Sequence, residues 1–411
     1  MRIPYFGYRP KLDPHGRAHD TTRPPRTSFL PFAPPSIGEE EIAEVVDTLR
    51  SDWLTTGPKT RAFEQQFGAY VGAPGGDSLM LNSCTAGLHV ALATLGIGPG
   101  DEVLVPSLTF AATANVVEHV GATPVLVDVL PDTLCLDPAA AEAAVTPRTR
   151  ALIPVHYAGH PADLEPLDTL AARHGLEVVE DAAHAAPTWY RGVMVGSRPN
   201  FASFSFYATK NLTTGEGGAL TGPTEHMDRA RSLALHGMSR DAWKRFDKGG
   251  SWEYDVVAAG FKYNMTDIQA ALGQHQLRKL AGFHERRQAI VARYQQAFTD
   301  VVALEPPTER PDVTSSWHLY VLRLRRDALR IDRNAFIEAL KARNIGTSVH
   351  YRPLHMMRFY AEKYGHRPND YPVARDAFER MLSLPLAPRM SDDDVEDVIA
   401  SVLDLVHEHA A

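Results

Sequence analysis

From Ile37 onward, short apolar runs alternate with stretches in which apolar residues recur at helical spacing, and this alternation limits the possible folds. The first helical stretch covers 39–50, where Ile42, Val45, Val46 and Leu49 share one face. The predicted strands cover 78–81, 102–105, 124–127, 151–155, 177–179, 202–206 and 218–220, with helices near 86–95, 111–119, 137–144 and 163–174. This βαβ order predicts an α/β fold with a mostly parallel central sheet and helices on both faces.

The pattern changes after about residue 266. A long helical stretch through Phe298 precedes predicted strands at 317–324 and 346–350 and helices at 333–343, 371–382 and 391–407, which indicates a smaller α+β C-terminal domain. The start of the chain is rich in prolines, which interrupt helices and lack a backbone donor. We therefore predict a proline-rich extended arm over 1–30, a large α/β domain over 31–265 and a small α+β domain over 266–411.

Charge and composition narrow the possible functions. Lys and Arg total 42 against 50 Asp and Glu, a net charge of −8, so we expect no nucleic-acid partner. No run approaches the roughly 18 apolar residues of a membrane span and no signal peptide is evident, so we expect no membrane partner and a cytoplasmic location. The two cysteines, Cys84 and Cys135, cannot form a disulfide framework, and no metal-binding spacing occurs.

Lys210 is the first candidate for chemistry. It follows the apolar run 202–206 and precedes a glycine-rich turn, the kind of strand end where α/β sheets bind ligands. An amine at this position suits Schiff-base chemistry, although a lone loop lysine is more often a solvated surface charge.

Asp181 and His184 follow another predicted strand. A buried carboxylate requires a cation or hydrogen bonds, and a protonated pyridine nitrogen is such a cation. The alternative is that Asp181 only caps the next helix.

Two further strand-to-helix turns carry candidate ligand contacts. Residues 81–89 run through small side chains into a helix, whose N-terminus favours an anion such as phosphate, although a simple N-cap has the same sequence. Phe110 lies at the other turn, where its ring could cover a flat cofactor or belong to the core.

These features occur within seven ordered motifs that resemble the DegT/StrS-type sugar aminotransferases, fold-type I enzymes that depend on pyridoxal 5′-phosphate (PLP). The resemblance extends from about residue 31 to about 405, through motifs at 53–58, 82–86, 106–110, 155–159, 180–185, 203–218 and 263–271. Within this family, 155–159 and 260–264 are similar to the type that forms UDP-4-amino-4-deoxy-L-arabinose.

The resemblance implies the role of each residue. Lys210 would form the internal aldimine and move the proton, and Asp181 would pair with the pyridine nitrogen. The remaining cofactor contacts would be the Thr85 and Ala86 amides and Ser205 on the phosphate, His184 on the 3-oxygen, Phe110 on the ring, and Asn264 on the phosphate of the neighbouring subunit. His318 would line the substrate side, and Tyr207, which replaces a frequent histidine, would alter the substrate pocket.

The resemblance also implies the reaction. L-glutamate would donate an amino group and leave as 2-oxoglutarate, and a nucleotide-linked keto-sugar, with a 4-keto sugar favoured, would accept it in a homodimer with shared active sites. An aminocyclitol aminotransferase is the first alternative, because such relatives share the cofactor motifs. A non-catalytic PLP-binding regulator is the second, but the arm is too short and too proline-rich for a DNA-binding helix-turn-helix. A sugar 3-dehydratase of the family would carry histidine in place of Lys210.

Overall fold

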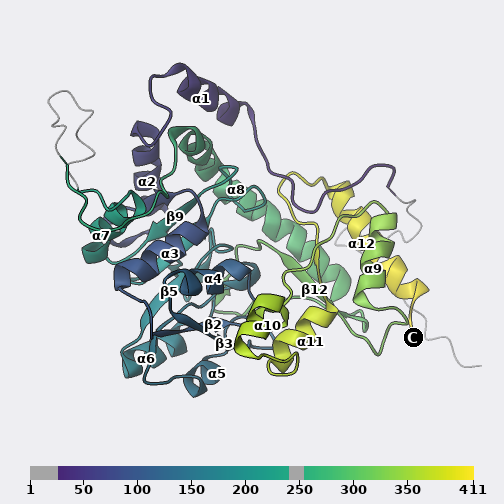
Figure 1. Cartoon of the computed structure of the whole chain (residues 1–411). Helices are drawn as coiled ribbons and strands as arrows, with labels where there is room; N and C mark the ends of the chain where they lie inside the picture. The colour runs from purple at the N-terminus through teal and green to yellow at the C-terminus, as the bar shows by residue number, and fades with distance from the viewer. Residues whose placement is uncertain (1–25, 240–253) are drawn as a thin grey trace, which may run out of the picture.

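The computed structural model describes residues 26–239 and 254–411, and its centre is a seven-stranded sheet (Figure 1). The strand order is β1-β9-β8-β5-β4-β2-β3. Strands β3, β2, β4, β5 and β8 are parallel, whereas β9 is antiparallel to β8 and β1. The bounds are β1 (Leu79–Leu81), β2 (Glu102–Pro106), β3 (Thr123–Val127), β4 (Thr149–Leu152), β5 (Glu177–Asp181), β8 (Phe201–Ser205) and β9 (Gly218–Thr221). These are the seven predicted runs, so the predicted α/β fold with a mostly parallel sheet is confirmed.

Helices cover both faces because each strand carries apolar side chains on alternating sides. Val103 and Val105 of β2 pack on one side, with α3, α4 and α7, and Leu104 packs on the other, with α5 and α6. Under β1, β8 and β9 the second face is covered by α2 and α8. The bounds are α2 (Pro58–Val71), α3 (Cys84–Leu95), α4 (Ala111–His119), α5 (Pro138–Ala143), α6 (Leu164–His174), α7 (Thr224–Ala234) and α8 (Asp267–Phe298).

The same alternation orients the end of β5. Val179 belongs to the core beneath α3 and α4, so Asp181, two residues on, projects to that face at the carboxyl end of the parallel strands. Glu180 projects to the opposite face, where its carboxylate contacts His156 Nε2 at 3.0 Å.

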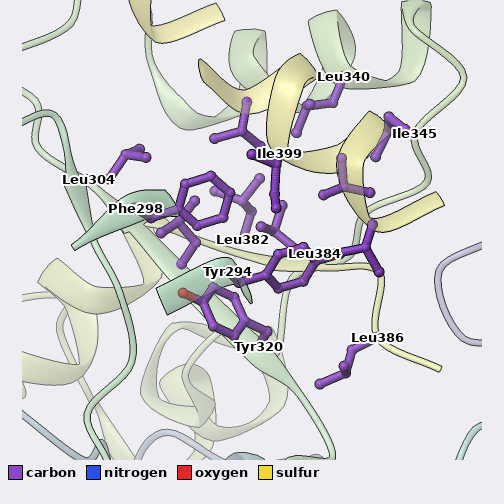
Figure 2. Close-up of a cluster of buried hydrophobic side chains, with 14 of the residues drawn as sticks. Tyr294, Phe298, Leu304, Tyr320, Leu340, Ile345, Leu382, Leu384, Leu386 and Ile399 are labelled. Carbon is purple, nitrogen blue, oxygen red and sulfur yellow. The ribbon is translucent and has the colours of Figure 1, made fainter. Parts of the chain in front are cut away.

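The C-terminal part packs a second core on a three-stranded sheet, β10-β12-β13 (Figure 2). Tyr294 and Phe298 at the end of α8 pack there against Tyr320 and Ile399. Because α8 contributes to both cores, the domain division at residue 266 stays a prediction. The remaining elements are β6 (Trp189–Tyr190), β7 (Val193–Met194), β10 (Leu304–Glu305), β11 (Val313–Thr314), β12 (Tyr320–Leu324), α9 (Arg333–Ala342), α10 (Arg358–Tyr364), α11 (Pro372–Arg380), β13 (Met381–Leu384) and α12 (Asp392–Glu408).

Two expectations for this part were wrong in detail. The predicted strand at 346–350 is irregular and makes one isolated bridge, between Ser348 and Ser383. The helix predicted over 371–382 ends at Arg380, because Met381 begins the buried strand β13, whose pairing with β12 overrides helical periodicity.

The N-terminal arm predicted over 1–30 lies mostly outside the described residues. From Arg26 the chain runs along the C-terminal part, where Leu30 forms a bridge with Ile345, and then enters α1 (Glu39–Arg50), which packs on α8 at the margin of the molecule (Figure 1). None of the helices in 26–239 and 254–411 is long and apolar enough to cross a bilayer.

Candidate active site

Lys210 lies in the turn that follows β8. The turn is closed by backbone bonds from Lys210 N–H to the Tyr207 carbonyl (2.9 Å) and from Phe206 N–H to the Gly217 carbonyl (2.9 Å). Its surroundings lower the pKa of the Lys210 amine to about 8, chiefly by burial, which the negative charges available to Cys84 and Asp181 partly oppose. Among the described residues the amine has no hydrogen-bond or ion-pair partner. It is therefore an amine with a substantial neutral fraction near neutral pH.

Asp181 is a buried carboxylate, 4% exposed, held by hydrogen bonds. Its Oδ2 accepts from the Thr113 hydroxyl (2.8 Å), and its Oδ1 accepts from Ala183 N–H (3.1 Å). Burial raises its pKa, and these bonds, followed by the charge on Lys210, oppose that rise. No cation among the described residues lies within salt-bridge distance of this carboxylate.

Three histidines surround Lys210. Burial lowers the pKa values of His184, His318 and His350, the last to about 4, and the charge of Lys210 lowers each further. The rings of His184 and His318 lie 4.4 Å apart. In the described part of the chain, no group of three or more His, Cys, Asp or Glu side chains could hold a metal ion.

The hydrogen bonds of His184 define its tautomer. Ala158 N–H donates to Nδ1 (3.2 Å), so this nitrogen carries the lone pair. The proton of the neutral ring is therefore on Nε2, which donates to the Tyr351 hydroxyl oxygen (3.1 Å). The hydroxyl hydrogen of Tyr351 has no acceptor among the described residues, which leaves it as a donor for a ligand.

The tautomer of His318 follows from Asn211. The Asn211 amide nitrogen donates to the Ser316 carbonyl (2.9 Å), so its oxygen is the atom that faces His318 Nδ1 (3.2 Å). Nδ1 therefore carries the proton, and Nε2 keeps a lone pair. His318 offers the site an acceptor where Tyr351 offers a donor.

The N-terminus of α3 provides backbone donors. The Ser83 hydroxyl caps the helix by accepting from Ala86 N–H (3.1 Å), whereas the N–H groups of Cys84 and Thr85 have no acceptor among the described residues. Gly218 of β9 lies against this turn, because a Cβ there would be 2.6 Å from the Cys84 nitrogen. Ser205 pairs in register with Gly218, so its hydroxyl is near the same turn.

Phe110 and Tyr207 are large side chains that remain exposed. Phe110, 58% exposed, precedes α4, and its ring centroid lies 5.6 Å from that of Tyr351. Tyr207, 47% exposed, is in the turn that leads to Lys210.

Asn264 lies beside the end of β1, where it forms a bridge with Leu81. Its amide nitrogen donates to the Thr56 hydroxyl (2.6 Å), and its oxygen accepts from the Lys262 amine (2.5 Å). It lines a cavity of about 530 Å³ together with Thr56 and Arg231, whereas Lys210 and Asp181 are not among the lining residues. Asn264 thus faces a different space from the lysine of its own chain.

The residues around Lys210 fit PLP. The buried carboxylate of Asp181 lacks a cation, which a protonated pyridine nitrogen would supply. The free amides at the start of α3 suit a phosphate, and Gly218 provides room beside them. With the parallel sheet, these features define a fold-type I, PLP-dependent enzyme.

Comparisons with known proteins give the family. Residues 35–403 match the DegT/DnrJ/EryC1/StrS aminotransferase family. The chain is 50% identical over 383 residues to the spore coat polysaccharide biosynthesis protein SpsC of Bacillus subtilis (strain 168), covering 93% of this chain and 98% of SpsC. The chain therefore belongs to the DegT/DnrJ/EryC1/StrS aminotransferase family, and it is a PLP-dependent aminotransferase.

Solved structures agree with this assignment. Spr1654 from Streptococcus pneumoniae in its PLP-form superposes with a TM-score of 0.86 at 38% identity, over 92% of this chain and 99% of that chain. The sugar aminotransferase CalS13 from Micromonospora echinospora superposes with a TM-score of 0.82 at 28% identity, over 91% and 99%.

The sequence did not single out every residue that shapes the site. Asn211 lies inside the motif at 203–218 and Thr113 inside the helix predicted at 111–119, but nothing in the local pattern distinguishes them from ordinary polar residues. Tyr351 follows the segment predicted as a strand at 346–350, so a polar aromatic at a strand end was the available signal.

Proposed function

We propose that this enzyme transfers the amino group of L-glutamate to a nucleotide-linked keto-sugar, at carbon 4 of the sugar. The observation that carries the transamination chemistry is the neutral-prone Lys210 amine beside the cation-free carboxylate of Asp181. A sugar acceptor is supported by the relatives, because CalS13 is a sugar aminotransferase and SpsC takes part in polysaccharide biosynthesis.

When bound, PLP supplies an electron sink for the pair released as a proton leaves the amino-bearing carbon. Asp181 would hold the pyridine nitrogen in its protonated form, because a carboxylate stabilises an adjacent positive charge. The Lys210 amine, neutral above about pH 8, would accept the proton from the amino-bearing carbon of the donor.

The other residues predicted to contact the cofactor would bind its phosphate, its ring and its 3-oxygen. The Thr85 amide and the Ser205 hydroxyl would bind the phosphate, with the Cys84 amide beside them, and Phe110 would cover the ring. Ala86 N–H already donates to the Ser83 cap, so its part would be to shape this turn. Both ring nitrogens of His184 already have hydrogen-bond partners, so His184 would act on the 3-oxygen indirectly. It would position the Tyr351 hydroxyl, which would donate to the 3-oxygen.

We further propose that the enzyme works as a homodimer with shared active sites. The outward face of α1 is apolar: Ile42, Val46 and Leu49 are 48%, 36% and 56% exposed, whereas Glu41 and Thr48 are buried. A surface helix normally shows the opposite arrangement, so a second copy of the chain is the expected cover. Asn264 would then contact the phosphate in the partner's site.

The reverse reaction tests the acceptor. Purified enzyme is mixed with 2-oxoglutarate and a panel of UDP- and dTDP-linked 4-amino sugars and free aminocyclitols, and glutamate is measured. We expect glutamate only with nucleotide-linked sugars, and none from a Lys210→Ala variant. Reaction with free aminocyclitols alone would refute the nucleotide-sugar acceptor and favour the aminocyclitol alternative.

A further inference from the structure

Asp181 is connected to two buried hydroxyl groups that have no part in the proposed function. The Thr113 hydroxyl lies 2.8 Å from Asp181 Oδ2, and the Thr109 hydroxyl lies 2.8 Å from that of Thr113. Thr109 and Thr113 are 1% and 0% exposed, and they lie on the turn and the first helical turn that begin α4. The three buried groups form a continuous hydrogen-bonded chain.

The direction of the hydrogen bonds in this chain depends on the charge of Asp181. Each hydroxyl has one hydrogen to donate. When the carboxyl is ionised, Thr113 donates to Oδ2 and Thr109 donates to Thr113, so both hydrogens are used. The Ala183 N–H donates to Oδ1 at the same time.

Protonation of Asp181 disrupts this arrangement. A proton on Oδ2 must point at Thr113, which then donates to Thr109, and the Thr109 hydrogen has no acceptor among the described residues. Oδ1 faces the Ala183 N–H, which is a donor, and the Cys84 sulfur at 3.9 Å, whose own hydrogen is directed to the Ser203 carbonyl, so a proton on Oδ1 finds only a weak sulfur acceptor. An unpaired buried polar hydrogen is costly, so the chain favours the ionised carboxyl.

We propose that Thr113 and Thr109 are positioning residues which keep Asp181 ionised and aimed at the ring nitrogen of the cofactor. The inference rests on the role proposed above for Asp181. Burial of the carboxyl acts in the opposite direction, so without the two hydroxyls Asp181 would take up a proton at higher pH. The other titratable groups that face Asp181 are Lys210, His156, Cys84 and Tyr351.

The first test uses the full chain without cofactor. Protonation of Asp181 is followed against pH by the infrared band of its protonated carboxyl, assigned by its loss in Asp181→Asn. We expect Thr113→Val to raise the midpoint by about one pH unit, because it removes a hydrogen bond to the charged form. Thr113→Ser should restore the wild-type midpoint, and Thr109→Val, which acts only through Thr113, should give a smaller rise.

Thr94 provides a matched control. It is 2% exposed in α3, and its hydroxyl has no partner among the described residues, so Thr94→Val removes a buried hydroxyl without touching Asp181. An unchanged midpoint in Thr113→Val, or an equal rise in Thr94→Val, would overturn the proposal. Thr109→Val keeps the test available should Thr113→Val fail to fold.

The second test uses the loaded enzyme. Two midpoints are measured against pH: that of the fall in the rate of the glutamate half-reaction on the acid side, and that of the change in the cofactor's absorbance. In Thr113→Val both midpoints should rise by about one pH unit. A shift in the cofactor-free protein with neither change in the loaded enzyme would show that Asp181 does not face the ring nitrogen. That outcome would refute the proposed role of Asp181 rather than the hydroxyl chain.

Discussion

A single amine shows how the surroundings of a residue decide its chemistry. A lysine in water has a pKa near 10.4 and is almost entirely protonated at neutral pH, which makes it a poor nucleophile and base. Burial lowers the pKa of Lys210 to about 8. The negative charges available to Cys84 and Asp181 oppose this change only in part, so a substantial neutral fraction of the amine remains beside the carboxylate that we propose for the cofactor.

This leads to a prediction about the pH dependence of cofactor uptake. The neutral fraction of Lys210 rises about tenfold per pH unit below 8 and levels off above it, so the rate at which cofactor-free protein takes up PLP should do the same. The rate is measured by stopped-flow absorbance between pH 6 and pH 10. A Lys210→Ala variant, which keeps the exposed Lys341, gives the background of surface lysines. A rate that continues to rise tenfold per unit up to pH 10 would show that Lys210 is an ordinary lysine.

At the scale of elements, the positions of the strands were more predictable from the sequence than the contacts that the helices and strands make. The seven runs of the central sheet were recognisable because buried strands are short and apolar, and four of these runs are followed by a stretch with helical spacing. The turn after β8 was recognisable from Lys210 and its glycines. Residues 346–350 were predicted as a strand as well, yet they make only one isolated bridge.

The contacts within the site could not be read from the sequence. Thr113 reaches Asp181 across 68 positions, and Tyr351 reaches His184 across 167. Local patterns contain no information on such pairs, which are created by packing α4 and the C-terminal part against β5. The periodicity of 39–50 likewise predicted a helix, but not that its apolar face would point outward.

The outward face of α1 gives a prediction at this scale. Ile42→Ser combined with Val46→Ser should weaken the dimer, because both side chains are exposed in the single chain and would be buried only against a partner. Sedimentation velocity should show a shift toward monomer at micromolar concentration, with unchanged helix content by circular dichroism. Val302→Ser, at a position 75% exposed, serves as the control and should not change the association. A dimer of undiminished stability in the double variant would show that α1 does not form the interface.

For the whole molecule, the separation of Asn264 from Lys210 is the important feature. Each chain carries the lysine, the carboxylate and the helix N-terminus of one proposed site, while its Asn264 lines a cavity that Lys210 and Asp181 do not line. In the proposed twofold dimer each such cavity would complete the other subunit's site, so every site would need both chains.

Mixing two inactive variants distinguishes a shared site from a self-contained one. Lys210→Ala removes the amine that we propose to react, and Asn264→Asp, with nearly the same shape, places a negative charge where the partner's phosphate would bind.

In a mixed dimer with shared sites, both changes fall in one site and the other site is intact. Random mixing makes half of the dimers mixed, each with one intact site of two, so about a quarter of wild-type activity should return after co-expression. If Asn264 served its own subunit, every site in the mixed dimer would carry one defect. Activity would then stay at the level of the two separate variants, and the shared-site assembly would be wrong.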